Sequence, residues 1–260
     1  MYTHNLDPIL FEFGFISIRW YSLAYIFGIL IGWWLGKKIL IKKTNSTTSS
    51  LKEEFDNLIT YLIIGIILGG RLGYVFFYNL NFYLENPLQI LMVWEGGMSF
   101  HGALIGVILV TYYFANSKER NLNTFFLLDI IACVTPIGLF FGRIANFING
   151  ELVGKVTNVS WAIIFPNIDN LPRHPSQLYE ALLEGLLLLI IMLTLISKKD
   201  YKNGTCSCAF LILYGFFRIF CEMFREPDIQ IGYLFDLISM GTMLSIVMIV
   251  VGSFIFIKKR

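Results

Sequence analysis

Apolar segments long enough to cross a lipid bilayer are the feature that most constrains the fold of this chain. We recognise seven of them, near residues 17–36, 58–80, 98–116, 122–142, 177–197, 206–224 and 232–257. A helix needs about 20 apolar residues to cross the hydrocarbon core of a membrane, and 56% of the 260 residues are hydrophobic. We therefore expect an all-α polytopic membrane protein, with seven transmembrane helices packed as a single domain over residues 1–260.

Basic residues predict the orientation of these helices. Four clusters contain 13 of the 20 Lys and Arg residues. They are Lys37, Lys38, Lys42, Lys43 and Lys52; Lys118 and Arg120; Lys198, Lys199 and Lys202; and Lys258, Lys259 and Arg260. Seven spans place all four clusters on one face, and such clusters favour the cytoplasmic side. We predict an external N-terminus, a cytoplasmic C-terminus and a small extracytoplasmic region at about 143–176.

The sequence indicates neither a cleaved signal peptide nor a cysteine-based metal site. The first apolar segment is preceded by no basic region and is followed by lysines, so it is read as a retained anchor and not as a signal peptide. The four cysteines lie within or beside the apolar segments, and Cys206 and Cys208 have no accompanying metal-ligand pattern. Apolar packing is the simpler role for them, and we predict no metal site.

Polar side chains interrupt the apolar segments at five places, all in the outer half of the membrane or at its edge in this topology. Ionisable groups at membrane depth are costly and mark functional sites. The densest run is 142–155, where arginine, carboxamides and a carboxylate suit an anionic head group. The five places contain Tyr21; Arg71; His101; Arg143, Asn146, Asn149 and Glu151; and Tyr214, Arg218, Glu222 and Arg225.

Each of these groups also has a structural interpretation. Arg218 and Glu222 can form an intrahelical pair that neutralises itself, although two arginines and a glutamate on one face of a membrane helix favour a function. His101 lies among glycines, where it can transfer a proton or simply contact another helix. Tyr21, taken alone, fits the aromatic belt at a membrane interface.

Four motifs, in order along nearly the whole chain, resemble those of the bacterial prolipoprotein diacylglyceryl transferases. They are Gly96–Gly102, Gly142–Gly154, His174–Glu180 and Tyr214–Asp228. The resemblance implies transfer of the diacylglyceryl group of phosphatidylglycerol to the lipobox cysteine of a prolipoprotein signal peptide. A thioether forms and glycerol phosphate leaves. The family resemblance also implies a bacterial cytoplasmic membrane protein that acts at the outer leaflet among membrane lipids, without cofactor, metal or nucleic acid.

The resemblance carries site residues with it. They are Tyr21, His101, Arg143, Asn146, Glu151, Gly154, Tyr214, Arg218 and Glu222. Because a guanidinium fork binds two phosphate oxygens, Arg143 and Arg218 are assigned to the phosphate, with Asn146, Gly154, Arg225 and Arg71 as further lipid-binding residues. His101 is assigned to proton transfer, although a histidine that positions the lipid fits equally well.

Two other classes of function are weighed against this reading. A lipid or solute transporter would need polar groups through both leaflets, whereas the inner halves of these segments contain almost no polar or charged residues. A receptor or scaffold would not need Arg143, Arg218, Glu222 and His101 at one depth. The sequence therefore favours the transferase.

Overall fold

The structure is a computed structural model that describes residues 2–13, 16–44, 49–117, 122–227, 233–234 and 238–259. Lys118, Arg120, Asp228 and Arg260, which the sequence analysis used, lie outside these residues. The chain divides into two compact units, one of Met1–Gly36 with Ile131–Arg260 and one of Lys37–Ile130. Each unit is described by itself below, and the single membrane domain stays a prediction.

Among the described residues, six helices are long and apolar enough to span a membrane. They are Trp20–Thr44 (α1), Leu51–Tyr78 within α2 (Ser49–Tyr78), Thr124–Asn149 (α5), Ser176–Ser197, Thr205–Glu222 (α8) and Met240–Lys259 (α9). The fourth of these consists of α6 (Ser176–Glu180), a π-helical stretch over Ala181–Leu187 and α7 (Leu188–Ser197). These helices confirm a mostly helical, polytopic architecture.

The predicted third span is a shorter apolar helix, α4 (Phe100–Ala115). Its 16 residues correspond to about 24 Å, which is less than the roughly 30 Å of a hydrocarbon core. The count of seven spans therefore stays a prediction.

Several predicted helix boundaries were wrong. Helix α1 continues to Thr44 and does not end near 36, and helix α2 begins at Ser49 and not near 58. Helix α5 continues to Asn149 and does not end near 142, so Arg143, Asn146 and Asn149 lie on its last turns and not in a loop. The apolar pattern stops at Arg143, but the helix stops only where Gly150 adopts a positive φ of 65°, the usual conformation after a helix C-terminus. Helix α9 begins at Met240 because β6 (Tyr233–Leu234) and β7 (Ile238–Ser239) form an antiparallel pair before it.

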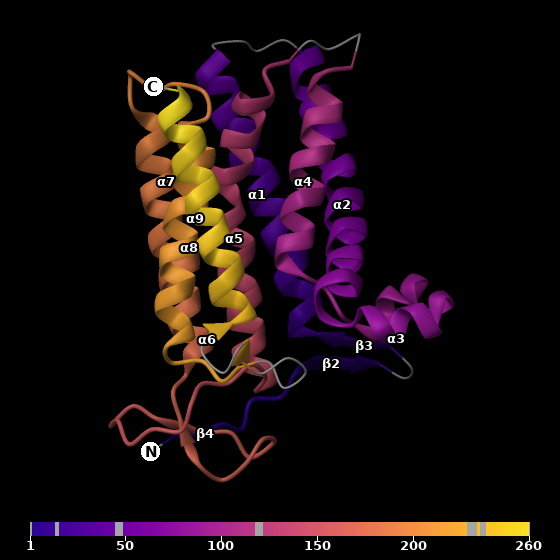
Figure 1. The fold of residues 1–260 in the computed structure, drawn as a ribbon, viewed down its shortest axis with the longest axis vertical. Coiled ribbons are helices and arrows are strands. Elements are labelled where there is room, and N and C mark those ends of the chain that lie inside the picture. Colours follow the sequence, from indigo (N-terminus) through magenta and orange to yellow (C-terminus); the bar gives the residue numbers. More distant parts are fainter. Residues whose placement is uncertain are drawn as a thin grey trace. The chain divides into compact units, whose positions relative to one another are not determined.

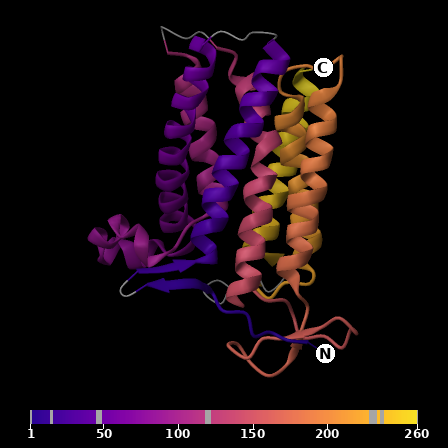
Figure 2. The same cartoon turned by 180° about the vertical axis from the view of Figure 1, so that it is seen from behind.

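Short strands tie the N-terminal residues to the long loop after α5. β1 (Tyr2–Thr3) pairs in parallel with β4 (Ile163–Ile164), which pairs with β5 (Pro172–Arg173). His4 follows β1, and its Nε2 lies 2.8 Å from the carbonyl oxygen of Phe147 at the end of α5. A hairpin of β2 (Ile9–Phe13) and β3 (Ile16–Arg19) then leads into α1 (Figure 2).

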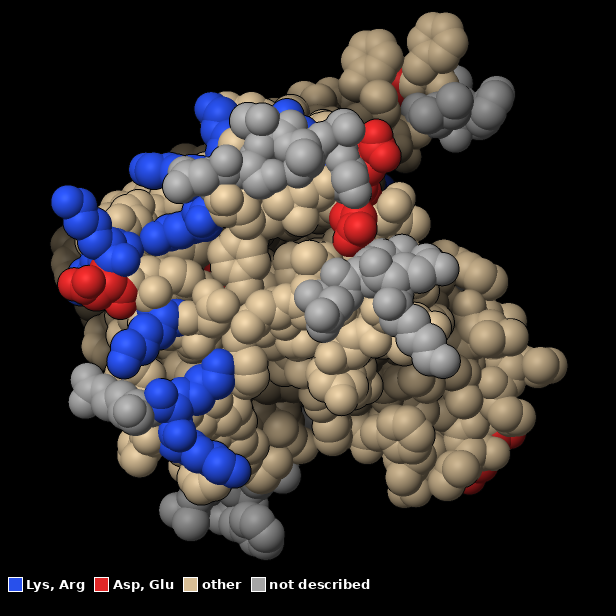
Figure 3. All heavy atoms as spheres, turned by 90° about the horizontal axis from the view of Figure 1, so that it is seen from above, with Lys and Arg blue, Asp and Glu red and all other residues tan. Residues whose placement is uncertain are grey.

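The helices of the larger unit include a closely packed pair, α8 and α9, which run side by side in Figure 1. The Lys259 ammonium donates to the carbonyl oxygen of Asn203 at 3.1 Å. The end of α9 therefore lies beside the loop with Lys198, Lys199 and Lys202, and two basic clusters share one end of this unit. Figure 3 looks onto that end, with Lys and Arg in blue.

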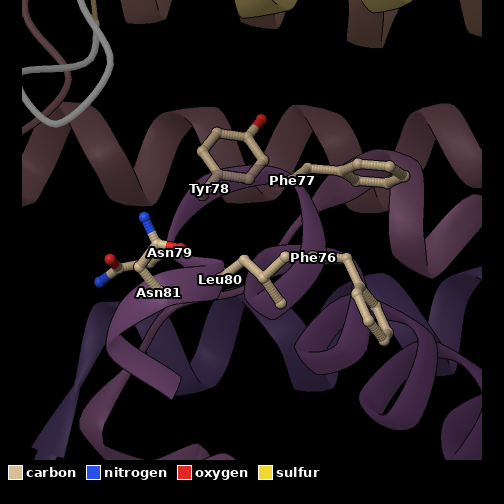
Figure 4. A pocket seen from close by; sticks show the side chains of 6 residues that line it. All are labelled: Phe76, Phe77, Tyr78, Asn79, Leu80 and Asn81. Atoms are coloured by element: carbon tan, nitrogen blue, oxygen red, sulfur yellow. The ribbon is translucent and has the colours of Figure 1, made fainter. Parts of the chain in front are cut away.

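Glycines set the packing of α2 against α4 in the unit of Lys37–Ile130. Gly65, Gly69 and Gly73 of α2 face Gly102 and Gly106 of α4. A Cβ at Gly69 would lie 3.0 Å from the Gly106 Cα, so larger residues would force the helices apart, as at other small-residue crossings. After α2 the chain continues through α3 (Leu80–Glu85) and two 3-10 turns, Pro87–Leu91 and Val93–Glu95. An open pocket lined by residues 76–81 lies where α2 meets α3 (Figure 4).

Candidate active site

The end of α5 holds Glu151 in a fixed place. The Asn146 amide donates to Glu151 Oε1 at 2.7 Å and the Asn149 amide does so at 3.4 Å. The Glu151 backbone N–H donates to the Asn146 carbonyl oxygen at 3.1 Å. From α6, the Gln177 amide donates to the Glu151 carbonyl oxygen at 2.7 Å. Asn146 and Asn149 therefore orient the Glu151 carboxylate, while Gln177 of the His174–Glu180 motif holds the Glu151 backbone.

Three arginines converge on a single oxygen of Glu180. Glu180 Oε2 lies 2.8 Å from Arg143 Nε, 2.8 Å from an Arg218 terminal nitrogen and 3.4 Å from an Arg225 terminal nitrogen. Arg143 comes from α5, Arg218 from α8 and Glu180 from the end of α6. The Glu180 side chain is fully buried. We call Arg143, Arg218, Arg225 and Glu180 the arginine cluster.

Two further carboxylates flank this cluster. Glu184, one helical turn after Glu180 and also fully buried, lies 3.5 Å from an Arg143 nitrogen and 3.7 Å from an Arg218 nitrogen. Glu222 accepts a hydrogen bond from Arg218, which confirms the predicted intrahelical pair. Three guanidinium groups thus face three carboxyl groups. Among the residues that the structure describes, the Arg143 terminal nitrogens make only contacts of 3.5 Å, to Asn146 and Glu184. Part of the Arg143 fork is therefore available to an anion.

Arg225 does not continue the face of α8, contrary to the sequence prediction. The helix ends at Glu222, and the Phe224 and Arg225 backbone N–H groups both donate to the Cys221 carbonyl oxygen. The chain turns there, and Arg225 forms a β-bridge with Gly154. The turn still directs the Arg225 side chain to Glu180.

Gly154 lies where two backbone segments approach each other closely. Its N–H donates to the His174 carbonyl oxygen at 3.0 Å, and the neighbouring Lys155 N–H donates to the Phe224 carbonyl oxygen at 2.8 Å. A Cβ at position 154 would collide with the His174 carbonyl oxygen and lie 2.7 Å from that of Phe224. Gly154 therefore permits the crossing that brings Arg225 to the cluster.

The two predicted tyrosines occupy different surroundings. Tyr214 is buried on α8 and stacks on Phe210, with ring centroids 5.6 Å apart. Tyr21, in the first turn of α1, is half-buried, and its hydroxyl lies 3.3 Å from that of the more exposed Tyr25. Tyr214 and Tyr21 both belong to the larger unit.

Arg71 and His101 belong to the other unit, Lys37–Ile130. Arg71 is buried and donates to five backbone carbonyl oxygens of one segment. They belong to Gln89, Ile90, Met92, Gly96 and Gly97. His101 is the second residue of α4, whose N-terminus is capped by the Ser99 hydroxyl on the Gly102 N–H at 3.2 Å. These contacts favour Arg71 as the anchor of the segment that leads to His101.

Comparison with known proteins assigns the chain to a family. The sequence model of the family described as prolipoprotein diacylglyceryl transferase matches residues 8–258. The chain is 52% identical over 256 residues to the phosphatidylglycerol–prolipoprotein diacylglyceryl transferase of Rickettsia bellii, covering 98% of this chain and 95% of that protein. It is 52% identical over 260 residues to the enzyme of the same name from Rickettsia typhi, covering 99% and 98%. The chain belongs to the prolipoprotein diacylglyceryl transferase family.

Sequence reasoning missed the carboxylates that organise the arginines of this family member. Glu180 was recognised only as the last residue of a motif, and Glu184 was not singled out. A signal was present, because three arginines within or beside apolar helices need counter-charges and two glutamates four residues apart share a helix face. Within the part of the chain that the structure describes, no three His, Cys, Asp or Glu side chains gather in a metal-binding arrangement.

Proposed function

We propose that this chain transfers a diacylglyceryl group from phosphatidylglycerol to the thiol of a prolipoprotein lipobox cysteine. The chain is a membrane transferase by its family and its helices, and its relatives at about 52% identity carry both substrates in their name. The observation that carries the proposal for the site is the arginine cluster, which gathers three guanidinium groups at the ends of apolar helices. The thioether product and glycerol phosphate as leaving group belong to the same proposal.

The chemistry needs charge stabilisation. The cysteine thiolate attacks a glycerol carbon, a C–S bond forms, and the C–O bond to phosphate breaks with its electron pair staying on the departing phosphate oxygen. Fixed cations in a site of low dielectric stabilise that growing negative charge. Arg143 and Arg218 supply them, and the Arg143 fork fits two phosphate oxygens. Asn146, Gly154 and Arg225 complete the lipid-binding part.

The thiol proton needs an acceptor, because the thiolate and not the thiol is the nucleophile. We assign this role to His101, with lipid positioning as its alternative. Glu151, Tyr214, Tyr21 and Glu222 are the other catalytic candidates. Arg71 contributes by holding the segment before His101, and its direct contact with lipid stays a prediction.

The proposal includes a bacterial cytoplasmic membrane, seven spans, an external N-terminus and a site at the outer leaflet. The four basic clusters support this orientation. In the larger unit, the contact between Lys259 and Asn203 adds support because it joins two of those clusters at one end.

A reconstitution experiment tests the function. Purified protein is mixed with phosphatidylglycerol vesicles and a synthetic lipobox peptide, and the peptide mass is followed. We expect a gain of one diacylglyceryl group on the cysteine, and none on a matched peptide with Cys→Ser. Vesicles of phosphatidylcholine alone serve as the second control. No mass gain from a folded, monodisperse preparation would contradict the proposal.

A further inference from the structure

Glu180 uses one oxygen for all of its arginine contacts. Oε2 lies within 2.8 Å of both Arg143 and Arg218 and 3.4 Å from Arg225. Oε1 is buried and makes no hydrogen bond with any residue that the structure describes. A single buried carboxylate oxygen thus joins guanidinium groups that come from two helices and from the turn after α8.

The contact with Arg143 selects one edge of its guanidinium group. Glu180 binds Nε, whereas the contacts of the two terminal nitrogens with the described residues are longer, at 3.5 Å to Asn146 and to Glu184. Arg218 is held on both terminal nitrogens, one by Glu180 and the other by Glu222. Glu180 therefore determines which nitrogens of Arg143 can bind a phosphate and fixes Arg218 relative to them.

We propose that Glu180 is a positioning residue for diacylglyceryl transfer, which acts by fixing the Arg143 and Arg218 guanidinium groups in the geometry that receives the lipid phosphate. The inference rests on the proposed function, since it assigns the same phosphate to those arginines. A buried ion pair contributes little net stability compared with apolar packing. Orientation of a catalytic group, by contrast, is worth a great deal, because a displacement of about 1 Å can reduce a rate about 100-fold.

Three substitutions separate position from charge. Glu180→Gln removes the carboxylate at nearly constant size, and Glu180→Asp keeps the charge one methylene farther back. Glu184→Gln is the matched control, because it removes an equally buried carboxylate on the same helix whose arginine contacts are all 3.5 Å or longer. Initial rates are measured against phosphatidylglycerol concentration in vesicles, and thermal unfolding is followed for every variant.

We expect Glu180→Gln to lower kcat/KM about 100-fold, Glu180→Asp to recover part of that loss, and Glu184→Gln to lose less than Glu180→Gln. If Glu180 acts only through Arg143 and Arg218, its substitution should matter less once those arginines have been replaced. We therefore expect Glu180→Gln to reduce kcat/KM by a much smaller factor in the Arg143→Lys, Arg218→Lys variant than in the wild-type protein.

Other results would contradict either the positioning role of Glu180 or the proposed function, and the two can be told apart. Folded Glu180→Gln with normal kcat/KM overturns the positioning role, as does an equal loss from Glu184→Gln. If Glu180→Gln fails to fold, Glu180→Asp decides, and a folded Asp variant with normal kcat/KM overturns the role. An inactive wild-type protein instead contradicts the proposed function itself.

Discussion

Arg143 Nε and Glu180 Oε2 lie 2.8 Å apart, and this ion pair joins the last turns of α5 to the end of α6. The Glu180 side chain is fully buried, with 1% of it exposed, and the Arg143 side chain is partly buried, with 16% exposed. The pair connects the polar run at 142–155 with the His174–Glu180 motif. Two motifs far apart in sequence thus build one charged cluster.

Arg143→Lys tests whether the guanidinium shape matters at this site. Lysine keeps the positive charge but cannot bind Glu180 with one edge and a phosphate with the other. We expect the variant to fold normally and to lose most of its turnover with phosphatidylglycerol. Turnover and thermal unfolding are measured side by side. Near-normal turnover would remove Arg143 from the phosphate role.

Gly154→Ala tests the close crossing of backbone segments. The added Cβ would meet the carbonyl oxygens of His174 and Phe224, so the crossing must open and Arg225 must shift. Overpacking of this kind costs about 1–3 kcal/mol, and we expect a lower unfolding temperature together with a loss of activity. Gly138→Ala is the control, since a Cβ there would have no heavy atom of the described residues within 4 Å. Equal behaviour of the two variants would contradict the steric argument.

The helical segments were predictable because apolar length is a local property of the sequence. The boundary of α5 was not, since Arg143, Asn146 and Asn149 are polar yet continue the helix to Gly150. Apolar patterns report where a membrane ends, whereas a helix ends where its backbone hydrogen bonds end.

The site was predictable as a set of residue types but not as a set of contacts. Arg143, Arg218 and Glu222 were recognised because charges are rare in apolar segments. Glu180 was not assigned a role, because its importance comes from contacts with residues 37 and 38 positions away. The pairing of Tyr2–Thr3 with Ile163–Ile164 was missed for the same reason.

The folded conformation of the long loop after α5 should become less stable as pH falls. A hydrogen bond from Arg173 lowers the pKa of Asp169, so this pair stabilises the loop above the ordinary Asp pKa near 4 and loses its effect as pH falls through the lower folded-state value. Burial lowers the pKa of His174, so the folded loop prefers the neutral ring and loses stability as pH falls below about 6.5.

Hydrogen exchange of residues 155–175 at pH 7.5, 5.5 and 3.5 measures both steps of this acid response. His174→Gln should remove the step near pH 6, while Asp169→Asn should remove the step below pH 4. A loop with the same protection at all three values would contradict the assignment.

Reporter fusions test the orientation. Cysteines or fusion reporters at Ser46, at Lys118 and after the C-terminus should all report the cytoplasm, because basic residues cluster near each position. A reporter in the 155–171 loop is the matched external position. An external report from any of the first three would overturn the seven-span topology.

His101→Asn separates proton transfer from lipid positioning. His101 is the second residue of the apolar helix α4 and lies beside the glycine-lined crossing of α2 and α4. Asparagine keeps a hydrogen-bonding group but cannot take a proton near neutral pH. If His101 accepts the thiol proton, turnover should fall by about 100-fold or more, phosphatidylglycerol affinity should change little, and the acidic limb of the pH–rate profile should disappear. A variant that binds the lipid poorly but keeps its turnover at saturation would make His101 a positioning residue and leave thiol activation to the arginines, Glu151 or Tyr214.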